Sequence, residues 1–321
     1  MKNAMKGLGL FLMSVMVMLC AGTASAQYPT KAVRVIIPYA AGGATDVVGR
    51  KVFEKVQTSL KQPFIVENRP STNATIGVDA VVRAAPDGYT VLYGAVGTQI
   101  PALLKNLPFD ALRDLEPVGM TTIGAIALIL DGQKFKSLQD FIAYAKANPG
   151  KINFGQGQTA ALLAMSLLQK EAGIQVAFIP YKGSGAARTA FMAGEVDAVF
   201  DALSGFQSMI DSGKARPVMF IGTKRTSLAP NLPTSAEAGY GTVRNLYSHN
   251  VWLPKGSPAE AVTALNRAIN ASVMQPDVGD LMRRNGSEPA TGTPQEMVAH
   301  VKMEMDIHTE GARVANFKPA D

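Results

Sequence analysis

The chain has 321 residues, of which 47% are hydrophobic and 17% are charged, and this balance excludes an intrinsically disordered protein. The formal net charge of +6 comes without a block of Lys and Arg residues, which disfavours a nucleic-acid-binding protein and suits small anions. A single core rarely grows beyond roughly 250–300 residues, so we expect two domains.

The N-terminus has the three regions of a secretory signal peptide. Two lysines precede an apolar stretch over residues 8–19, and the small residues Ala24-Ser25-Ala26 follow. We therefore predict cleavage after Ala26 and a location in the periplasm. A membrane anchor is disfavoured because the apolar stretch is shorter than the roughly 18–20 residues that span a bilayer.

Cys20 is the only cysteine, and it lies inside the predicted signal peptide. The mature chain then has neither disulfides, thiolate metal sites nor a cysteine nucleophile. Lipid attachment at Cys20 is an alternative, which the bulky Leu19 before it disfavours. The three histidines, 249, 300 and 308, do not form the H-x-x-x-H spacing of a zinc site. We predict neither a metal nor a cofactor.

From Val33 onward, short apolar or β-branched runs alternate with segments that have apolar residues at helical spacing. The runs predict strands at 33–37, 63–66, 89–93, 118–130, 151–154, 176–180, 196–200 and 216–221. The segments predict helices at 45–61, 74–84, 137–147, 159–172, 185–193, 204–212, 259–274 and 294–311. This alternation predicts an α/β fold with largely parallel sheets.

The chain has no linker rich in Pro, Gly and Ser between two contiguous halves. We therefore expect it to cross between two lobes twice, near 120–130 and 216–222. Residues 27–125 and 223–321 would form one lobe, and residues 126–222 the other.

The stretch PYAAGGATD, residues 38–46, follows the first predicted strand. In a βα unit this loop lies at the carboxyl edge of the sheet, where the N–H groups of the next helix favour an anion. Gly42 and Gly43 let the backbone approach a ligand, and Thr45 or Asp46 can cap the helix. A plain turn with an N-cap is the alternative.

The stretch GQGQTA, residues 155–160, follows another predicted strand and formally matches the G-x-G-x-x-A dinucleotide fingerprint. The next strand, 176–181, lacks the acidic residue that would bind a ribose, so we do not expect a nicotinamide cofactor. An anion or amide site at the start of the helix is favoured, with a bare turn as the alternative.

Four further polar residues follow predicted strands. Thr98 and Gln99 are neutral side chains that can hydrogen-bond an anion. Asp201 either accepts from a ligand or caps the next helix. Lys182 is interpreted as a solvated lysine rather than a ligand partner. Because the loops follow strands in both proposed lobes, they predict one shared cleft.

The sequence offers little support for catalysis. Gly183-Ser184-Gly185 does not have the G-x-S-x-G spacing of a nucleophile elbow, and no other nucleophile has a convincing base. An exported hydrolase-like enzyme that uses the same cleft remains the alternative to a binding protein.

Several stretches together carry a specific resemblance: YPTKAVRVIIPYAAGGATD (28–46), VENRP (66–70), APDGYTVLYG (85–94), LPFDALRDLEPV (107–118), IPYKGSG (179–185), GEVDAVFD (194–201), LPTSAEAGY (232–240) and WLPKGSP (252–258). In order and spacing the chain resembles the Bug-type periplasmic solute-binding proteins of the tripartite tricarboxylate transporter system. The chain departs from that pattern at Ala40-Ala41, at 71–74 and at 160–163.

The resemblance implies a two-lobed type II periplasmic-binding-protein (Venus-flytrap) fold that closes on a small carboxylate. The resemblance leaves the chemical class of this ligand open: a di- or tricarboxylate, an acidic amino acid or an aromatic acid. It also implies a monomer that delivers the ligand to a membrane permease, although a ligand sensor for a signalling system would have the same site. The implied ligand contacts are Tyr39, Ala41, Gly42, Gly43, Thr45, Asp46, Thr98, Gln99, Gln156, Gly157, Gln158, Thr159, Ala160, Asp201 and Tyr247.

Overall fold

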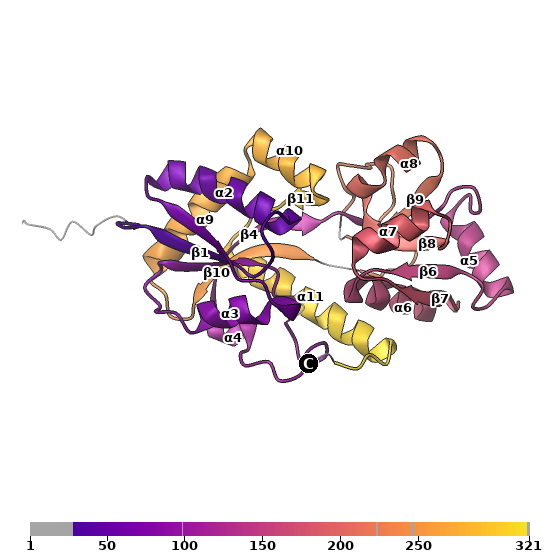
Figure 1. The fold of residues 1–321 in the computed structure, drawn as a ribbon, viewed down its shortest axis with the longest axis horizontal. Coiled ribbons are helices and arrows are strands. Elements are labelled where there is room, and N and C mark those ends of the chain that lie inside the picture. Colours follow the sequence, from indigo (N-terminus) through magenta and orange to yellow (C-terminus); the bar gives the residue numbers. More distant parts are fainter. Residues whose placement is uncertain (1–27, 98, 223, 245–246, 320–321) are drawn as a thin grey trace, which may run out of the picture.

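The computed structural model describes residues 28–319, with the exception of residues 98, 223 and 245–246. Two α/β lobes lie side by side, and each is built around its own sheet (Figure 1). The predicted two-lobed α/β fold is therefore confirmed. The predicted signal peptide falls outside the described residues. Within the described part of the chain, no helix has both the length and the apolar character needed to cross a bilayer.

The first lobe is built on a six-stranded sheet with the order β11-β4-β10-β3-β1-β2. Its strands are β1 (Val33–Ile37), β2 (Phe64–Asn68), β3 (Thr90–Gly94), β4 (Leu115–Gly124), β10 (Ser248–Pro254) and β11 (Ser287–Pro289). One face is covered by α2 (Ala44–Leu60), α9 (Ala259–Val273) and α10 (Pro276–Arg284). The other is covered by α3 (Thr75–Val82), α4 (Ala111–Asp114) and α11 (Pro294–Val314), and a 3₁₀ turn, η1 (Thr72–Ala74), precedes α3.

The second lobe is built on a five-stranded sheet with the order β7-β6-β8-β5-β9. Its strands are β5 (Ile126–Asp131), β6 (Asn153–Gln156), β7 (Ala177–Pro180), β8 (Ala198–Ala202) and β9 (Ala215–Phe220). The helices α5 (Leu138–Ala147) and α6 (Thr159–Ala172) pack on one face. On the other face pack α7 (Ser184–Met192), the 3₁₀ turn η2 (Leu203–Gly205) and α8 (Gln207–Asp211).

Strand β1 shows why an apolar run without alternation forms a central strand. Val33, Val35 and Ile37 pack into the core under α2, whereas Ile36 packs into the core under α3. A strand that is buried on both faces needs apolar side chains on both of them, so its sequence does not alternate between apolar and polar residues. The loop after β1 is thereby fixed at the carboxyl edge of the sheet.

The prediction of largely parallel sheets is wrong. Among the named strands, parallel pairing is confined to β1 with β2 and β3, and to β6 with β7 and β8. Strand β10 is antiparallel to β3 and β4, β11 is antiparallel to β4, and β5 is antiparallel to β8 and β9. β5 and β10 each follow a crossing between the sheets, so no βαβ crossover requires them to run parallel to a neighbour.

The predicted strand at 118–130 is two strands, because the chain leaves the first sheet at Gly124 and joins the second at Ile126. The second crossing comes after β9. Leu232 and Val243 both pack into cores of the second lobe. This packing favours a second crossing after Val243 rather than at 216–222, and the division into lobes stays a prediction.

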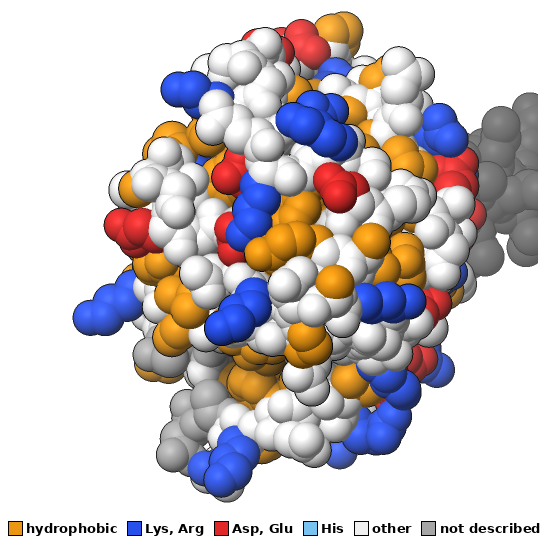
Figure 2. All heavy atoms as spheres, turned by 90° about the vertical axis from the view of Figure 1, so that its right-hand side faces the viewer, with side chains coloured by type: hydrophobic (Ala, Val, Ile, Leu, Met, Phe, Trp, Pro, Cys, Tyr) orange, Lys and Arg blue, Asp and Glu red, His pale blue; other side chains and the backbone are white. Residues whose placement is uncertain are grey.

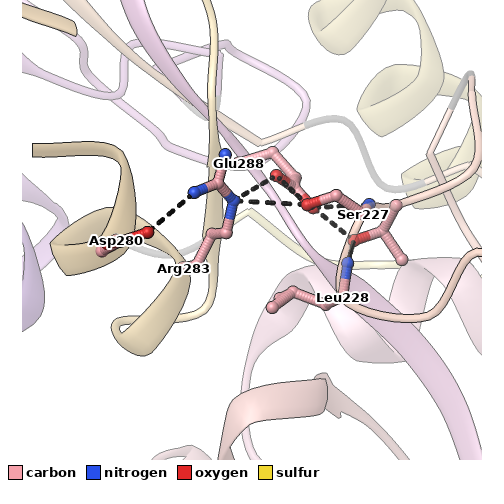
Figure 3. A network of polar contacts seen from close by, with 6 residues as sticks. Ser227, Leu228, Asp280, Arg283 and Glu288 are labelled. Carbon is pink, nitrogen blue, oxygen red and sulfur yellow. Dashed lines mark hydrogen bonds and ion pairs between the residues drawn. The ribbon is translucent and has the colours of Figure 1, made fainter. Parts of the chain in front are cut away.

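The contacts that join the lobes outside the crossings include a polar network and a helix packing. Glu288 of β11 accepts hydrogen bonds from Thr226 and Ser227 (Figure 3). Arg283 of α10 donates to the hydroxyl of Ser227 and forms an ion pair with Glu288 (Figure 3). The long helix α11 begins against the first sheet and ends against α6 of the second lobe (Figure 1). A Cβ added at Gly311 of α11 would lie 2.9 Å from the Cβ of Leu163 in α6, so this glycine permits the close approach.

Candidate functional site

A cavity of about 310 Å³ lies between loops of the two lobes. Six of the residues that the sequence predicted as ligand contacts line it: Tyr39, Gln99, Gln158, Thr159, Ala160 and Tyr247. Six others complete its wall: Ser71, Asn73, Ala74, Leu103, Leu104 and Phe317. Three larger hollows, of about 560, 630 and 770 Å³, do not include either predicted loop, so the smaller cavity is the candidate site.

The first loop, residues 39–46, is shaped by Asp46. Gly42 has φ +78° and donates its N–H to the Asp46 carboxylate at 2.9 Å. The same carboxylate accepts from Arg50 and from Asn68, and the Asn68 amide also donates to the carbonyl of Tyr39 at 3.0 Å. Burial raises the pKa of Asp46, but these donors outweigh it and the pKa is lowered. Asp46 therefore holds the loop in shape with a permanent charge.

Helix α2 begins after Gly43, which is its N-cap and has no side chain to cap it. The expectation that Thr45 or Asp46 caps this helix is therefore not met, since both lie in its first turn. Ala41, Gly42 and Gly43 are exposed and do not line the cavity.

A buried polar cluster lies behind Tyr247. Nε2 of His249 lies 2.6 Å from the Tyr247 hydroxyl and 2.8 Å from Oγ1 of Thr45, and Nδ1 lies 3.1 Å from Oγ1 of Thr122. Burial lowers the pKa of His249 to about 4, so the imidazole is neutral at pH 7. Through this histidine, the first turn of α2 fixes the position of a tyrosine in the cavity wall.

Gln99 is the most buried polar predicted contact in the cavity wall, with 4% of its surface exposed. Its Nε2 donates to the carbonyl of Asn73 at 2.6 Å. Among the described residues its Oε1 has no hydrogen-bond partner. Asn73 and Ala74 both have positive φ, at 60° and 62°, so a tight turn delivers this carbonyl to Gln99. The predicted contact Thr98 lies outside the described residues.

The second loop, residues 155–160, leads into α6. Gln158 is the N-cap of this helix and makes no side-chain capping bond, so the first N–H groups of α6 lack an intrahelical partner. A Cβ at Gly157 would lie 2.8 Å from the Cα of Ser184 and 2.9 Å from the carbonyl of Gly183. Gly157 thus permits the loops before α6 and α7 to touch. The carbonyl of Gln156 accepts from the N–H of Tyr181 at 2.9 Å.

Asp201 lies away from the cavity and forms an ion pair. Its carboxylate is 2.9 Å from the guanidinium of Arg188 and accepts from the N–H of Ala202 at 2.7 Å. Burial raises its pKa against the opposing effect of Arg188. At the end of β8, Asp201 therefore makes these contacts within the second lobe.

The wall of the cavity is neutral. None of its described residues is Lys, Arg, Asp, Glu or His. In the described part of the chain, no group of three or more His, Cys, Asp or Glu side chains could hold a metal ion. Lys and Arg side chains are instead spread over the outer end of the second lobe (Figure 2). An anion in the cavity would therefore be held by N–H groups, hydroxyls and amides.

Sequence reasoning missed half of the wall. Ser71, Asn73 and Ala74 follow the VENRP stretch, and their departure from the family pattern was a usable signal. Leu103, Leu104 and Phe317 carry no local signal, because only the packing of the chain's C-terminal end against residues 100–104 brings them together.

Comparison with known proteins gives a family. Residues 48–311 match the model of the "Tripartite tricarboxylate transporter family receptor". The chain is 34% identical over 278 residues to Protein BugT of Bordetella pertussis, covering 84% of each chain.

Two solved structures with bound ligands are similar along nearly their whole length. Rpa4515 of R. palustris with adipate is 27% identical with a TM-score of 0.74, covering 91% of this chain and 100% of that chain. MatC from Rhodopseudomonas palustris with bound malate is 26% identical with a TM-score of 0.69, covering 89% of this chain and 100% of that chain. The chain therefore belongs to the receptor family of the tripartite tricarboxylate transporters, which confirms its resemblance to the Bug-type solute-binding proteins.

Proposed function

We propose that this receptor works in the periplasm, where it captures a small organic carboxylate in the cavity between its lobes and delivers it to a membrane permease. The observation that carries the proposal is that one cavity, with a neutral wall, is lined by loops of both lobes and by the start of α6. The adipate and malate bound by the two similar structures support a carboxylate as the ligand.

The hydrogen-bond donors in the cavity wall suit one carboxylate. The unpaired N–H groups at the start of α6 and the helix dipole favour a negative charge by about 0.3–1 kcal/mol, and by more when partly buried. The hydroxyl of Thr159 and the neighbouring amides add neutral donors. A ligand held in this way needs no arginine, because charge-assisted hydrogen bonds to backbone N–H groups stabilise a carboxylate.

We infer that binding closes the lobes. The chain crosses between the sheets at Ala125 and again after Val243, so two short segments would absorb the rotation. Closure would bring the start of α6 and the first loop nearer to the ligand. A permease that recognises the closed form would then distinguish loaded from empty receptor.

We further infer that the site binds its ligand without converting it. The hydroxyls in the wall include Ser71 and Thr159, and the wall has no His, Asp or Glu among its described residues to serve as a base. The buried histidine behind Tyr247, His249, is already engaged by Thr45, Thr122 and Tyr247.

A thermal-shift screen of organic acids tests the proposal. At least one carboxylate should raise the melting temperature, because a ligand stabilises the folded state by RT ln(1 + [L]/Kd). The Thr159→Asp variant should lose the shift, since it places a negative charge where the ligand's charge would lie. Thr58→Asp, at an exposed position outside the cavity, is the matched control and should keep the shift. No shift with any carboxylate, or turnover of a bound acid, would contradict the proposal.

A further inference from the structure

We propose that the second lobe carries a docking site for an acidic segment of the membrane permease. The inference rests on the proposed function, because it assumes a partner in the membrane. The site is the hollow of about 630 Å³ beside the start of α5 and strand β9, which we call the basic hollow. Its wall consists of residues 136–139, 216–218, 229–233, 237 and 238, and it shares none of them with the ligand cavity.

Two cations line the basic hollow, and neither has an acidic partner in the described part of the chain. Lys136 is exposed, and its Nζ lies 3.5 Å from the carbonyl of Gly132, at the limit of a hydrogen bond. Arg216 is half-buried, and its guanidinium forms no ion pair with a residue that the structure describes. Both charges therefore remain available to a partner that brings carboxylates.

Two acids near the basic hollow are already engaged. Glu237 lines the wall, and its carboxylate lies 3.0 Å from the guanidinium of Arg225. Asp140 of α5 does not line the wall, and its carboxylate accepts from the backbone N–H of Lys136 at 2.9 Å. Neither acid neutralises the two cations, so the wall presents an excess of positive charge.

The wall of the basic hollow keeps its shape without a partner. Residues 229–233 form a loop beside β9, which is the edge strand of the second sheet. The backbone N–H of Phe220 donates to the carbonyl of Pro233 at 2.8 Å and fastens this loop to the strand. Pro217, Pro230 and Pro233 also line the hollow and restrict its backbone. A preformed wall loses little conformational freedom when it binds a partner.

The stretch LPTSAEAGY, residues 232–240, favours a role other than ligand binding. It is one of the stretches that carry the resemblance to the receptor family. Leu232, Pro233, Glu237 and Ala238 from this stretch line the basic hollow, and none of its residues lines the ligand cavity. Delivery to the permease is the step of the proposed function that needs a surface outside the ligand cavity.

An acidic segment fits the basic hollow better than a free acid does. The hollow is open to solvent, so a small acid there would stay hydrated and would gain little from one exposed cation. A segment with several carboxylates can meet Lys136 and Arg216 together, while its apolar side chains cover the exposed Pro230. Because the hollow lies within one lobe, we expect it to bind the permease with and without ligand.

Fluorescence anisotropy with two labelled peptides tests the site directly. The acidic probe is Asp-Leu-Glu-Leu-Asp, and its control replaces each carboxylate by an amide, Asn-Leu-Gln-Leu-Asn. The acidic peptide should bind about tenfold more tightly than the control, and added salt should weaken it. Malate, as a free-acid probe, should not displace it at equal concentration.

Variants of the two cations test the protein side. Lys136→Glu reverses a charge at an exposed position and should weaken the acidic peptide by about tenfold, and Arg216→Gln should weaken it severalfold. Lys136→Arg keeps the charge and should bind as wild type does. Lys151→Glu is the matched control, because Lys151 is exposed on the same lobe outside the hollow, and it should leave the affinity unchanged. All four variants should keep the thermal shift with a carboxylate, which shows that they fold.

Uptake by cells tests the membrane partner. The double variant of Lys136→Glu and Arg216→Gln replaces the receptor in the bacterium that produces it. Uptake of the acid with the largest thermal shift should fall by about tenfold, whereas the thermal shift of the purified variant stays normal. The Lys151→Glu variant should support uptake at the wild-type rate.

The outcomes separate the two proposals. Normal uptake with the double variant overturns the docking site while the receptor function stands. Equal affinity for the two peptides, failure of both to bind, or displacement of the acidic peptide by malate also overturns the docking site alone. If wild-type protein shows no thermal shift with any carboxylate, or if wild-type cells do not take up the acid that it binds, the proposed function fails and the docking site fails with it.

Discussion

The carboxylate of Glu288 in β11 accepts hydrogen bonds from both the backbone N–H of Ser227, at 2.8 Å, and its hydroxyl, at 2.9 Å (Figure 3). Ser227 precedes a segment that packs into the second lobe, whereas β11 belongs to the sheet of the first. The pair therefore fastens the two lobes together outside the chain crossings.

Replacing Glu288 by Gln should lower the free energy of unfolding by about 1–2 kcal/mol, because an amide loses the charge and one of the two acceptor oxygens. Burial raises the pKa of Glu288, but hydrogen bonds from Thr226 and Ser227 outweigh it and the pKa is lowered from the usual 4.5. The charge contribution should therefore be complete above pH 4.5 and should disappear as the pH falls through the lowered pKa.

Urea unfolding of wild type and Glu288→Gln between pH 7 and pH 3 measures this difference. Asp280→Asn is the matched control, since Asp280 pairs with Arg283 at an exposed position and should change stability by less than about 0.5 kcal/mol. Equal losses in the two variants would show that Glu288 does not fasten the lobes.

His249 should make the protein less stable in mild acid. Burial lowers its pKa from 6.5 to about 4, so the unfolded chain takes up a proton at a pH where the folded chain does not. The free energy of unfolding should fall by on the order of 3 kcal/mol between pH 6.5 and pH 4. His249→Gln should flatten this slope, although His308, whose pKa burial also lowers, will keep part of it. An unchanged slope in the variant would contradict the assignment.

Gly157 should tolerate no side chain. Valine at this position would press on the Cα of Ser184 and the carbonyl of Gly183, and overpacking of this kind costs about 1–3 kcal/mol. We expect lower stability and a loss of carboxylate binding, because the second loop would move. Gly185→Ala, where no heavy atom lies within 4 Å of the added Cβ, is the control and should bind normally. Normal binding by Gly157→Val would show that the second loop does not position the ligand.

The fold was largely predictable because most strands are continuous apolar runs and most helices have apolar residues at helical spacing. β1 and α6 have the predicted bounds. β10 was missed because it begins with the polar residues Ser248, His249 and Asn250, which are buried and make hydrogen bonds inside the first lobe. A strand that buries polar side chains at its start has no continuous apolar pattern to detect.

The wall of the candidate cavity was predictable where loops follow strands, and the role of its residues in binding stays a prediction. The second loop supplied Gln158, Thr159 and Ala160, and the resemblance supplied Tyr39 and Tyr247. It was not predictable where distant segments meet, as with Phe317 and Leu104. Asp46 is a third case. It was predicted as a ligand contact, but its carboxylate accepts hydrogen bonds from Gly42 and Asn68 and so stabilises its own loop.

The central claim is that a carboxylate binds between the lobes, and a crystal structure with the acid that gives the largest thermal shift tests it most directly. We expect density for the ligand in the cavity, with a carboxylate at the first N–H groups of α6 and the ligand in contact with Tyr39 and Gln99. Density elsewhere, such as in the groove between Lys136 and Arg216 on the second lobe, would contradict it.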